Sequence, residues 1–365
     1  MPDTEASMPN IDKEALAEAL ASLSVMAAPG GYERRINRWL MSRWQPAVDE
    51  SWLTRVGNLI AHVQGSGPKL MICSHADEVN FVVRAISDGG FLWITMPGEG
   101  RRPYTRGPYM LPTGQDALVV GSTQDVPGIF GTTLGHLATY EDERPLTWDD
   151  LFVDVWARDR EQVEAWGIRI GAPVVWNPPV RRKGDFLSGK AMDNRVGLTI
   201  MDGLLEALDR TKLQFDLYLA STMHEELGFI GAASVNDQIG CSYAVALDVG
   251  LAGDIPTVSD RRVSNALGAG PLLVHYDRLA YDVPLTRGLR TAAVDHGIPI
   301  QDGVFSGYSS DGLELLKSGA AAALLTVPTR YTHSPIETVH LDDVAHAVQV
   351  LKAFLETGIS EGEYT

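Results

Sequence analysis

The C-terminal half of the chain constrains the fold most, because helical and strand-like patterns alternate along it. Helical periodicity is present in MDNRVGLTIMDGLLEALDRT, at the start of GFIGAASVND and over residues 341–355. Short apolar runs separate these segments, in LQFDLYLASTM, YAVALDVG and AAALLTVP. Such alternation is typical of a largely parallel or mixed sheet with helices on both faces. The sequence therefore predicts an α/β fold.

The N-terminal segment continues the same pattern. IDKEALAEALASLSVMAA and ERRINRWLMSRW have the spacing of amphipathic helices. RVGNLIAHVQGSGPKLMICSHAD is typical of two strands joined by a Gly-Ser-Gly-Pro turn, and the second strand ends near His75. These elements are expected to complete the α/β domain.

The middle of the chain differs from both ends in its strand patterns and in its Gly and Pro content. Between about residues 81 and 178 the strand patterns are short, and Gly and Pro are frequent in turns such as SDGG and GQDA. We expect this segment to be a small β-rich domain inserted into the larger one. The catalytic domain would then comprise residues 1–80 plus 179–365, and the inserted domain residues 81–178.

Charge and composition exclude several classes of partner. The 365 residues carry a formal net charge of −17, which argues against binding to nucleic acid or to an anionic membrane surface. No apolar run approaches the length of a membrane span, and the first residues lack the basic and apolar segments of a secretory signal. The two cysteines, Cys73 and Cys241, lie in apolar runs and are expected to be buried thiols. A cytoplasmic location is the expectation.

Histidines and carboxylates occur at the ends of predicted strands and at the starts of predicted helices. Open α/β sheets place their functional sites at this edge. Taken singly, each residue has an ordinary explanation, such as a helix N-cap, a solvated acidic pair or an exposed loop histidine. Taken together, two histidines and three carboxylates could coordinate a pair of divalent metals. The candidate ligands are His75, Asp193, Glu226, Asp248 and His333.

One carboxylate is left over from this set. Burying Glu225 and Glu226 side by side would be costly if both were unpaired, but it becomes favourable if Glu226 binds a cation and Glu225 transfers a proton. Asp77 is placed to accept a hydrogen bond from the imidazole of His75 and to fix its tautomer. His224 is expected to pack or to support the site without binding metal. Imidazole and carboxylate ligands favour zinc, cobalt or manganese, so the pattern predicts a two-metal hydrolase.

The order of these segments also resembles a known family. SHADEVNF, GKAMDNRVG, HEELGFIGA, ALDVG and YTHSPIE are similar in sequence and order to segments of the glutamyl or tetrahedral aminopeptidases, family 42 among metallopeptidases. The resemblance covers nearly the whole chain from about residue 12. It implies a phosphorylase/hydrolase-like catalytic domain of the co-catalytic metallopeptidases. It also implies that residues 81–178 mediate dimerisation, and that dimers can assemble into tetrahedral particles of twelve subunits.

The resemblance implies a role for each site residue. His75, Asp193 and Asp248 would hold one metal, and Asp193, Glu226 and His333 the other, so that Asp193 bridges the two. Glu225 would be the general base that takes a proton from the bridging water. Asp77, assigned from its position beside His75, is expected to be a second catalytic residue. The cofactors would be two divalent ions, with zinc favoured over cobalt and manganese. The substrates would be peptides with a free N-terminus.

Three departures from the family pattern accompany the resemblance. Asn80 stands where Gly is commoner, His224 stands where Gln is commoner, and SGYSSDG at residues 306–312 differs from the usual GGTDA-like loop. The third departure leaves the preferred N-terminal residue open. Two other functions also stay open: hydrolysis of another small amide, and a non-catalytic, metal-bearing scaffold. Glycoside hydrolysis is disfavoured, because glycosidases use paired carboxylates without needing two metals.

Overall fold

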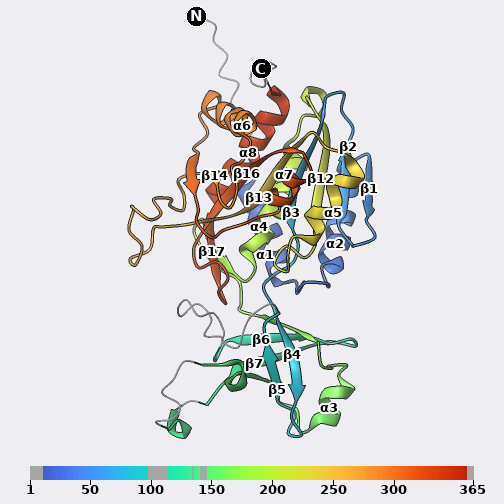
Figure 1. Ribbon diagram of the computed structural model, residues 1–365, viewed down its shortest axis with the longest axis vertical. Coiled ribbons are helices and arrows are strands. Elements are labelled where there is room, and N and C mark those ends of the chain that lie inside the picture. Colours follow the sequence, from blue (N-terminus) through green and yellow to red (C-terminus); the bar gives the residue numbers. More distant parts are fainter. Residues whose placement is uncertain (1–10, 98–112, 134, 140–145, 360–365) are drawn as a thin grey trace, which may run out of the picture.

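The protein consists of a large α/β body and a smaller β body, connected by the chain segments before β4 and after β9 (Figure 1). The computed structural model describes residues 11–97, 113–133, 135–139 and 146–359. The α-helices are α1 (Lys13–Val25), α2 (Arg34–Trp44), α3 (Arg160–Ala165), α4 (Met192–Ala207), α5 (Ile230–Ile239), α6 (Val283–Asp295), α7 (Gly312–Lys317) and α8 (Leu341–Thr357).

An eight-stranded mixed sheet forms the centre of the large body, in the order β1-β2-β12-β3-β13-β16-β14-β15. The four central strands, β12, β3, β13 and β16, are parallel to one another, whereas β2 and β14 pair antiparallel with them. The prediction of an α/β fold is confirmed. The strands are β1 (Glu50–Leu53), β2 (Leu59–Val63), β3 (Lys69–His75), β12 (Asp216–Thr222), β13 (Tyr243–Leu251), β14 (Leu272–Tyr276), β15 (Gln301–Val304) and β16 (Ala321–Thr329).

Helices cover both faces of this sheet, as the alternating side chains of its strands require. In β13, Val245 and Leu247 belong to the core shared with α1, α4, α6 and α8. Ala244 and Ala246 face the opposite core, shared with α5 and α7. With both faces occupied, the C-terminal edge of the parallel strands is the part of the sheet left for a site.

Local sequence explains where key helices begin and how closely they pack. The Asp12 side chain accepts hydrogen bonds from the backbone N–H groups of Glu14 and Ala15 and so caps α1. Gly197 lets α4 approach β3, because a Cβ at this position would lie 2.3 Å from the Ser74 hydroxyl. This approach brings the start of α4 next to the C-terminal end of β3.

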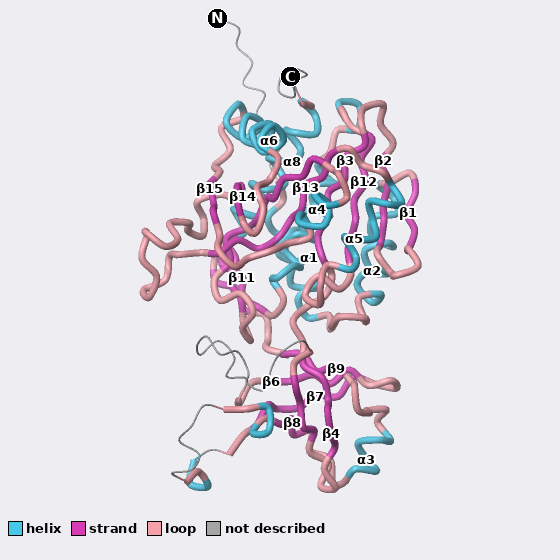
Figure 2. The backbone as a smooth tube through the Cα atoms, in the orientation of Figure 1, coloured by secondary structure: helices cyan, strands magenta, loops and turns pink. Residues whose placement is uncertain are grey.

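The smaller body is a closed antiparallel barrel in the order β4-β5-β8-β7-β6-β9, below the large body in Figure 2. Phe81 lies at its centre and makes edge-to-face contacts with Phe130 and Trp176, with ring centroids 5.1 and 5.2 Å away. The barrel strands are β4 (Phe81–Ile86), β5 (Leu92–Thr95), β6 (Asp116–Val120), β7 (Asp125–Gly131), β8 (Phe152–Asp154) and β9 (Pro173–Trp176).

A three-stranded sheet lies beside the large sheet, in the order β10-β11-β17. Its strands are β10 (Arg181–Lys183), β11 (Phe186–Gly189) and β17 (Glu337–His340). Cys73 and Cys241 are buried free thiols, as predicted. Among the described residues, no helix combines the length and the apolar character that crossing a membrane demands.

Candidate metal centre

Four neighbouring parallel strands bring most of the predicted ligands to one edge of the sheet. His75 is the last residue of β3 and is in register with Thr222, the last residue of β12. Glu225 and Glu226 follow β12, and His333 follows β16. Asp248 differs from the expectation of a strand end, because it lies inside β13, which continues to Leu251.

Asp193 joins this edge from the start of α4. Its backbone is not helical, with φ −77° and ψ 100°, and its N–H donates to the Glu337 carboxylate at 2.9 Å. The two oxygens of Asp193 therefore face different histidines. Oδ1 lies 3.0 Å from His75 Nε2, and Oδ2 lies 3.3 Å from His333 Nε2. Asp193 does not cap the helix; the side-chain oxygen of the next residue, Asn194, accepts a hydrogen bond from the N–H of Gly197 at 3.1 Å.

The predicted ligands form two groups that share Asp193. The ligand atoms of His75, Asp193 and Asp248 lie within 4.8 Å of one another, and so do those of Asp193, Glu226 and His333. Two ligand atoms that bind one zinc ion tetrahedrally at about 2.1 Å lie about 3.4 Å apart. The distances from His333 Nε2 to Asp193 and Glu226, 3.3 and 3.4 Å, are close to this value.

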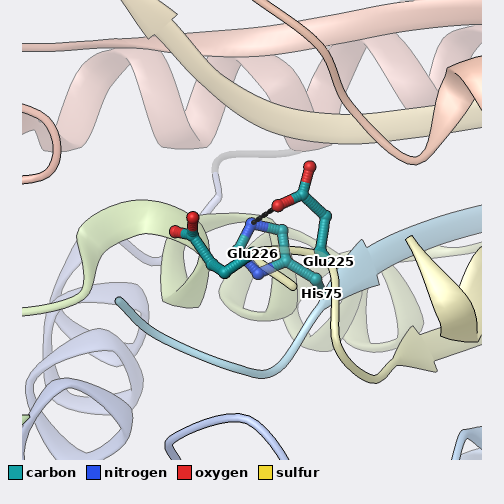
Figure 3. A group of neighbouring side chains, drawn as sticks. All are labelled: His75, Glu225 and Glu226. Carbon is teal, nitrogen blue, oxygen red and sulfur yellow. Dashed lines mark ion pairs between the residues drawn. The ribbon is translucent and has the colours of Figure 1, made fainter. Parts of the chain in front are cut away.

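Glu225 lies beside His75 and Glu226, which belong to different groups (Figure 3). Its Oε2 is 3.9 Å from His75 Nε2, and it also forms a compact group with His75 and Glu226. In Figure 3 the carboxylates of Glu225 and Glu226 approach the His75 ring from different sides. These two adjacent residues are therefore not equivalent within the cluster.

Burial and an excess of negative charge perturb the protonation of the cluster. Burial raises the pKa of both Glu225 and Asp248 well above the usual value, and neighbouring carboxylates add to the effect. The Glu226 carboxylate raises the pKa of His333 well above its usual value. Burial opposes the charged form of His75, but Glu225, Asp193 and Asp77 together raise its pKa. Bound cations would offset this negative charge, so the donor set and its charge fit divalent metals.

Two carboxylates hold the backbone around these residues. Asp77 accepts hydrogen bonds from the backbone N–H groups of Glu225 and Glu226 at 3.0 and 3.1 Å, and its Oδ1 lies 3.4 Å from His75 Nδ1. Glu337 accepts from the N–H groups of Asp193 and His333. Burial, together with the charge of Asp193, raises the pKa of Glu337 to about 8. Sequence reasoning missed Glu337, although it is part of the quoted THSPIE segment.

A buried ion-pair network supports the loop after β3. The Glu78 carboxylate accepts hydrogen bonds from Lys190 Nζ at 2.6 and 2.8 Å and from the N–H of Ala28 at 2.8 Å. The fully buried Arg195 donates to the carbonyl oxygens of Ala76 and Asp77. No local sequence pattern predicts this network, and its one signal is that Lys190 and Arg195 flank the AMDN segment.

A cavity of about 240 Å³ opens onto the cluster. Besides the acidic residues and His333, its walls are formed by the neutral residues Gly228, Phe229, Gly307, Tyr308 and Ser309. Tyr308 donates a hydrogen bond from its hydroxyl to the carbonyl oxygen of Val249 at 2.7 Å, which fixes its ring. The unusual segment 306–312 therefore contributes to the wall of this cavity.

The other two departures lie outside the metal-binding groups. The backbone N–H of His224 donates to Glu33 at 3.1 Å, so His224 supports the loop before Glu225. Asn80 is buried, and its side-chain carbonyl accepts a 3.4 Å hydrogen bond from the N–H of Gly30.

A further group of possible ligands, Asp185, His340 and Asp342, is a weaker candidate. Lys13 Nζ already binds both carboxylates, at 3.2 and 2.7 Å. A cation from the chain itself therefore neutralises this group.

Comparison with known proteins agrees with the geometry. A model of the M42 glutamyl aminopeptidase family matches residues 57–350. The lysyl aminopeptidase of Pyrococcus furiosus is 27% identical over 91% of this chain and 95% of its own length. An aminopeptidase from the archaeon Desulfurococcus kamchatkensis has a similar structure, with a TM-score of 0.87 and 30% identity over 95% of this chain and 96% of its own.

The TET1 peptidase of Pyrococcus horikoshii is also similar in structure. Its TM-score is 0.83 with 25% identity, and the match covers 93% of this chain and 99% of the peptidase. The family match spans well over half of the sequence, and the similar structures extend over nearly all of it. The chain therefore belongs to the M42 glutamyl aminopeptidase family and is a hydrolase that acts on peptide bonds.

Proposed function

We propose that this chain is a dinuclear-metal aminopeptidase that removes N-terminal residues from peptides, with Glu225 as the general base. The observation that carries the proposal is the placement of Asp193. Its two carboxylate oxygens face two separate donor groups, which is the geometry a bridging ligand needs.

Each predicted ligand has a place in the proposed centre. His75, Asp193 and Asp248 would hold one cation, and Asp193, Glu226 and His333 the other. Nitrogen and oxygen donors suit zinc, with cobalt and manganese as the alternatives. When bound, such ions polarise the scissile carbonyl and lower the pKa of the attacking water.

Glu225 has the environment of a proton carrier. Its carboxylate belongs to neither of the two donor groups, lies 3.9 Å from His75 Nε2 and lines the cavity, and burial raises its pKa. It would take a proton from the attacking water and deliver it to the amine of the leaving peptide. Asp77 would fix the backbone of Glu225 and orient the imidazole of His75. A scaffold without catalysis would have no need to bury this extra carboxylate.

We also propose that the protein self-associates through the barrel and acts in the cytoplasm. The Pyrococcus horikoshii relative can assemble into a tetrahedron or a large octahedral shell. In this chain, residues 81–178 would form the dimerisation domain, and residues 1–80 plus 179–365 the catalytic domain. Apolar side chains exposed on the barrel support this role: Phe91, Ile129, Leu137, Trp156 and Ile170. Free cysteines fit a reducing compartment.

The decisive experiment measures hydrolysis of aminoacyl-p-nitroanilides and short peptides by protein that has been stripped of metal and then reloaded. We expect turnover only after reloading with zinc, cobalt or manganese, and release of single N-terminal residues. Neutral N-terminal residues should be preferred over Glu, because no Lys or Arg is among the described residues that line the cavity. Bound metal without peptide turnover would favour a different amide substrate or the scaffold.

A further inference from the structure

A second cavity, of about 200 Å³, is lined by residues of α6, the end of β14 and the turn after it. Figure 1 shows β14 and α6, and β14 lies next to β15, the edge strand of the large sheet at the end opposite β1. The second cavity shares no lining residue with the cavity at the metal centre. Its lining residues come from the end of β14, the turn after it and one face of α6: His275, Tyr276, Tyr281, Val283, Thr286, Arg287 and Arg290.

The charged side chains that line this cavity are basic, whereas the protein as a whole is acidic. Two arginines and one histidine line it, although the chain has a net charge of −17. Asp302 pairs with both Arg290 and His275, so one carboxylate serves two basic groups. Arg287 is exposed and has no hydrogen-bonded or ion-paired partner within the described chain. The cavity therefore retains a guanidinium group that can bind an anion.

Thr286 is a second polar group in the wall of this cavity, and its hydrogen-bonding capacity is unused among the described residues. Its side chain is only 4% exposed, and its hydroxyl oxygen is buried without a hydrogen-bond partner among the described residues. Buried hydroxyl groups nearly always have partners in folded proteins. Thr286 and Arg287 lie on the same face of α6 as Val283 and Arg290, because these positions are three, four and seven residues apart.

The remaining walls determine what kind of anion fits. Tyr276, Tyr281 and Val283 supply apolar surface, and Tyr276 and Val283 are more than half exposed. We propose that this cavity binds a small carboxylate with an apolar body. The carboxylate would pair with Arg287 and accept a hydrogen bond from the Thr286 hydroxyl, while the apolar body would pack against the two tyrosines and Val283.

The position of Tyr281 connects this cavity to the metal centre. Its hydroxyl donates to Asp277 at 2.7 Å and lies 3.0 Å from the Ser310 hydroxyl. Ser310 belongs to the segment 306–312, in which Tyr308 and Ser309 line the cavity of the metal centre. A ligand packed against Tyr281 would therefore change the position of segment 306–312. In this way binding in the second cavity would be coupled to the cavity of the metal centre.

Isothermal titration calorimetry of the metal-loaded protein tests the binding. The probes are 3-phenylpropionate, its neutral amide, and N-acetylphenylalanine, which represents the C-terminal residue of a peptide. None of them carries the free amine of an aminopeptidase substrate. Leucine hydroxamate is present throughout to saturate the metal centre. We expect at least one acid to bind and the amide to bind at least tenfold more weakly.

Three variants assign the binding to this cavity. Arg287→Ala should weaken binding of the acid about tenfold or more, and Thr286→Val should weaken it several-fold without lowering the thermal unfolding midpoint. Arg181→Ala, an exposed arginine on β10, should leave binding unchanged. Equal binding of acid and amide, or unchanged affinity in Arg287→Ala, would overturn the site. If only N-acetylphenylalanine binds, the ligand is a peptide C-terminus, and if 3-phenylpropionate binds equally well, it is a free acid.

Steady-state kinetics then test the coupling. With 3-phenylpropionate or N-acetylphenylalanine saturating the second cavity, the KM for a neutral aminoacyl-p-nitroanilide should change at least twofold. The change should disappear in Arg287→Ala, which separates it from direct competition at the metals. It should also disappear in Tyr281→Phe, which keeps the apolar wall but loses the contact with Ser310. Saturation without any change in KM or kcat would overturn the coupling. Because calorimetry does not depend on turnover, failure of the aminopeptidase assignment would not affect the binding result.

Discussion

At the scale of single residues, the adjacent pair Glu225 and Glu226 shows how neighbours in sequence come to occupy different positions in one cluster. Asp77 binds the backbone N–H groups of both residues and fixes the direction of the chain. Glu226 then reaches His333 at 3.4 Å, whereas Glu225 lies 3.9 Å from His75. In the proposed centre, Glu226 would therefore be a ligand and Glu225 would be left for proton transfer.

The Glu225→Gln variant should separate binding from catalysis. The amide cannot take up a proton, so kcat should fall by about 10²- to 10⁴-fold, the usual contribution of general base catalysis. Metal content by elemental analysis and the thermal unfolding midpoint should stay close to those of the parent. Glu18→Gln, an exposed residue of α1, is the matched control. Full activity of the Glu225 variant would remove this residue from the mechanism.

Removing His333 should empty one of the two proposed metal positions. Asp193 and Glu226 alone would remain in that group, so elemental analysis should find a loss from about two metals to about one per chain. His333→Asn is a useful companion to His333→Ala, because Asn tolerates the backbone φ of 60° at this position. His136→Ala, an exposed histidine outside the cluster, should retain both metals. Unchanged metal content in both His333 variants would reject its role as a ligand.

At the scale of elements, the periodicity of the strands made much of the fold predictable. Apolar runs of the right length identified β3, β12, β13 and β16, and the polar residues at their ends indicated the edge where the cluster lies. Local pattern does not determine spatial order, and β12 lies between β2 and β3, which are consecutive in sequence. The contacts of Glu337 with Asp193 and of Glu78 with Lys190 join residues more than 100 positions apart. Such contacts follow from tertiary packing, for which a single sequence carries no local signal.

The start of α8 should contribute a pH-dependent part of the stability. Asp343 is fully buried and accepts hydrogen bonds from the N–H groups of Gly268 and Gly270, but burial raises its pKa to about 6. The unfolded chain would have an Asp pKa of about 3.9. The folded chain therefore binds a proton at Asp343 more tightly than the unfolded chain does. The resulting contribution to the free energy of unfolding, roughly 3 kcal/mol in total, is fully present below about pH 4 and is lost as the pH rises through about 6.

Urea unfolding between pH 4.5 and 7.5 tests this contribution. The free energy of unfolding of Asp343→Asn should decline less over this window than that of the parent, because Asn does not titrate. Asp342→Asn is the control, since Lys13 lowers the pKa of Asp342 and places its titration below the window. Parallel pH profiles for the parent and Asp343→Asn would contradict the assignment.

At the scale of the whole molecule, the barrel is attached close to the proposed metal centre. Phe81 begins β4 only six residues after His75, and the intervening loop contains Asp77 and Glu78. Arg195 and Lys190 donate hydrogen bonds to this loop and hold it in place. The loop therefore links the position of the barrel to the position of the site residues. An assembly that fixes the barrel would therefore also restrain the loop that carries part of the cluster.

Sedimentation equilibrium should show a mass that corresponds to two or more chains of 39.6 kDa each. If the barrel forms the interface, the double variant Leu137→Ser/Ile170→Ser should shift the distribution towards the monomer, because it removes two apolar side chains that are 81% and 69% exposed in the single chain. Val294→Ser on α6, which is 63% exposed, should leave the mass unchanged. The reverse outcome would place the interface on the α/β body. Since Leu137 and Ile170 do not line the metal-centre cavity, loss of peptide turnover in the monomeric double variant would show that assembly restrains the site.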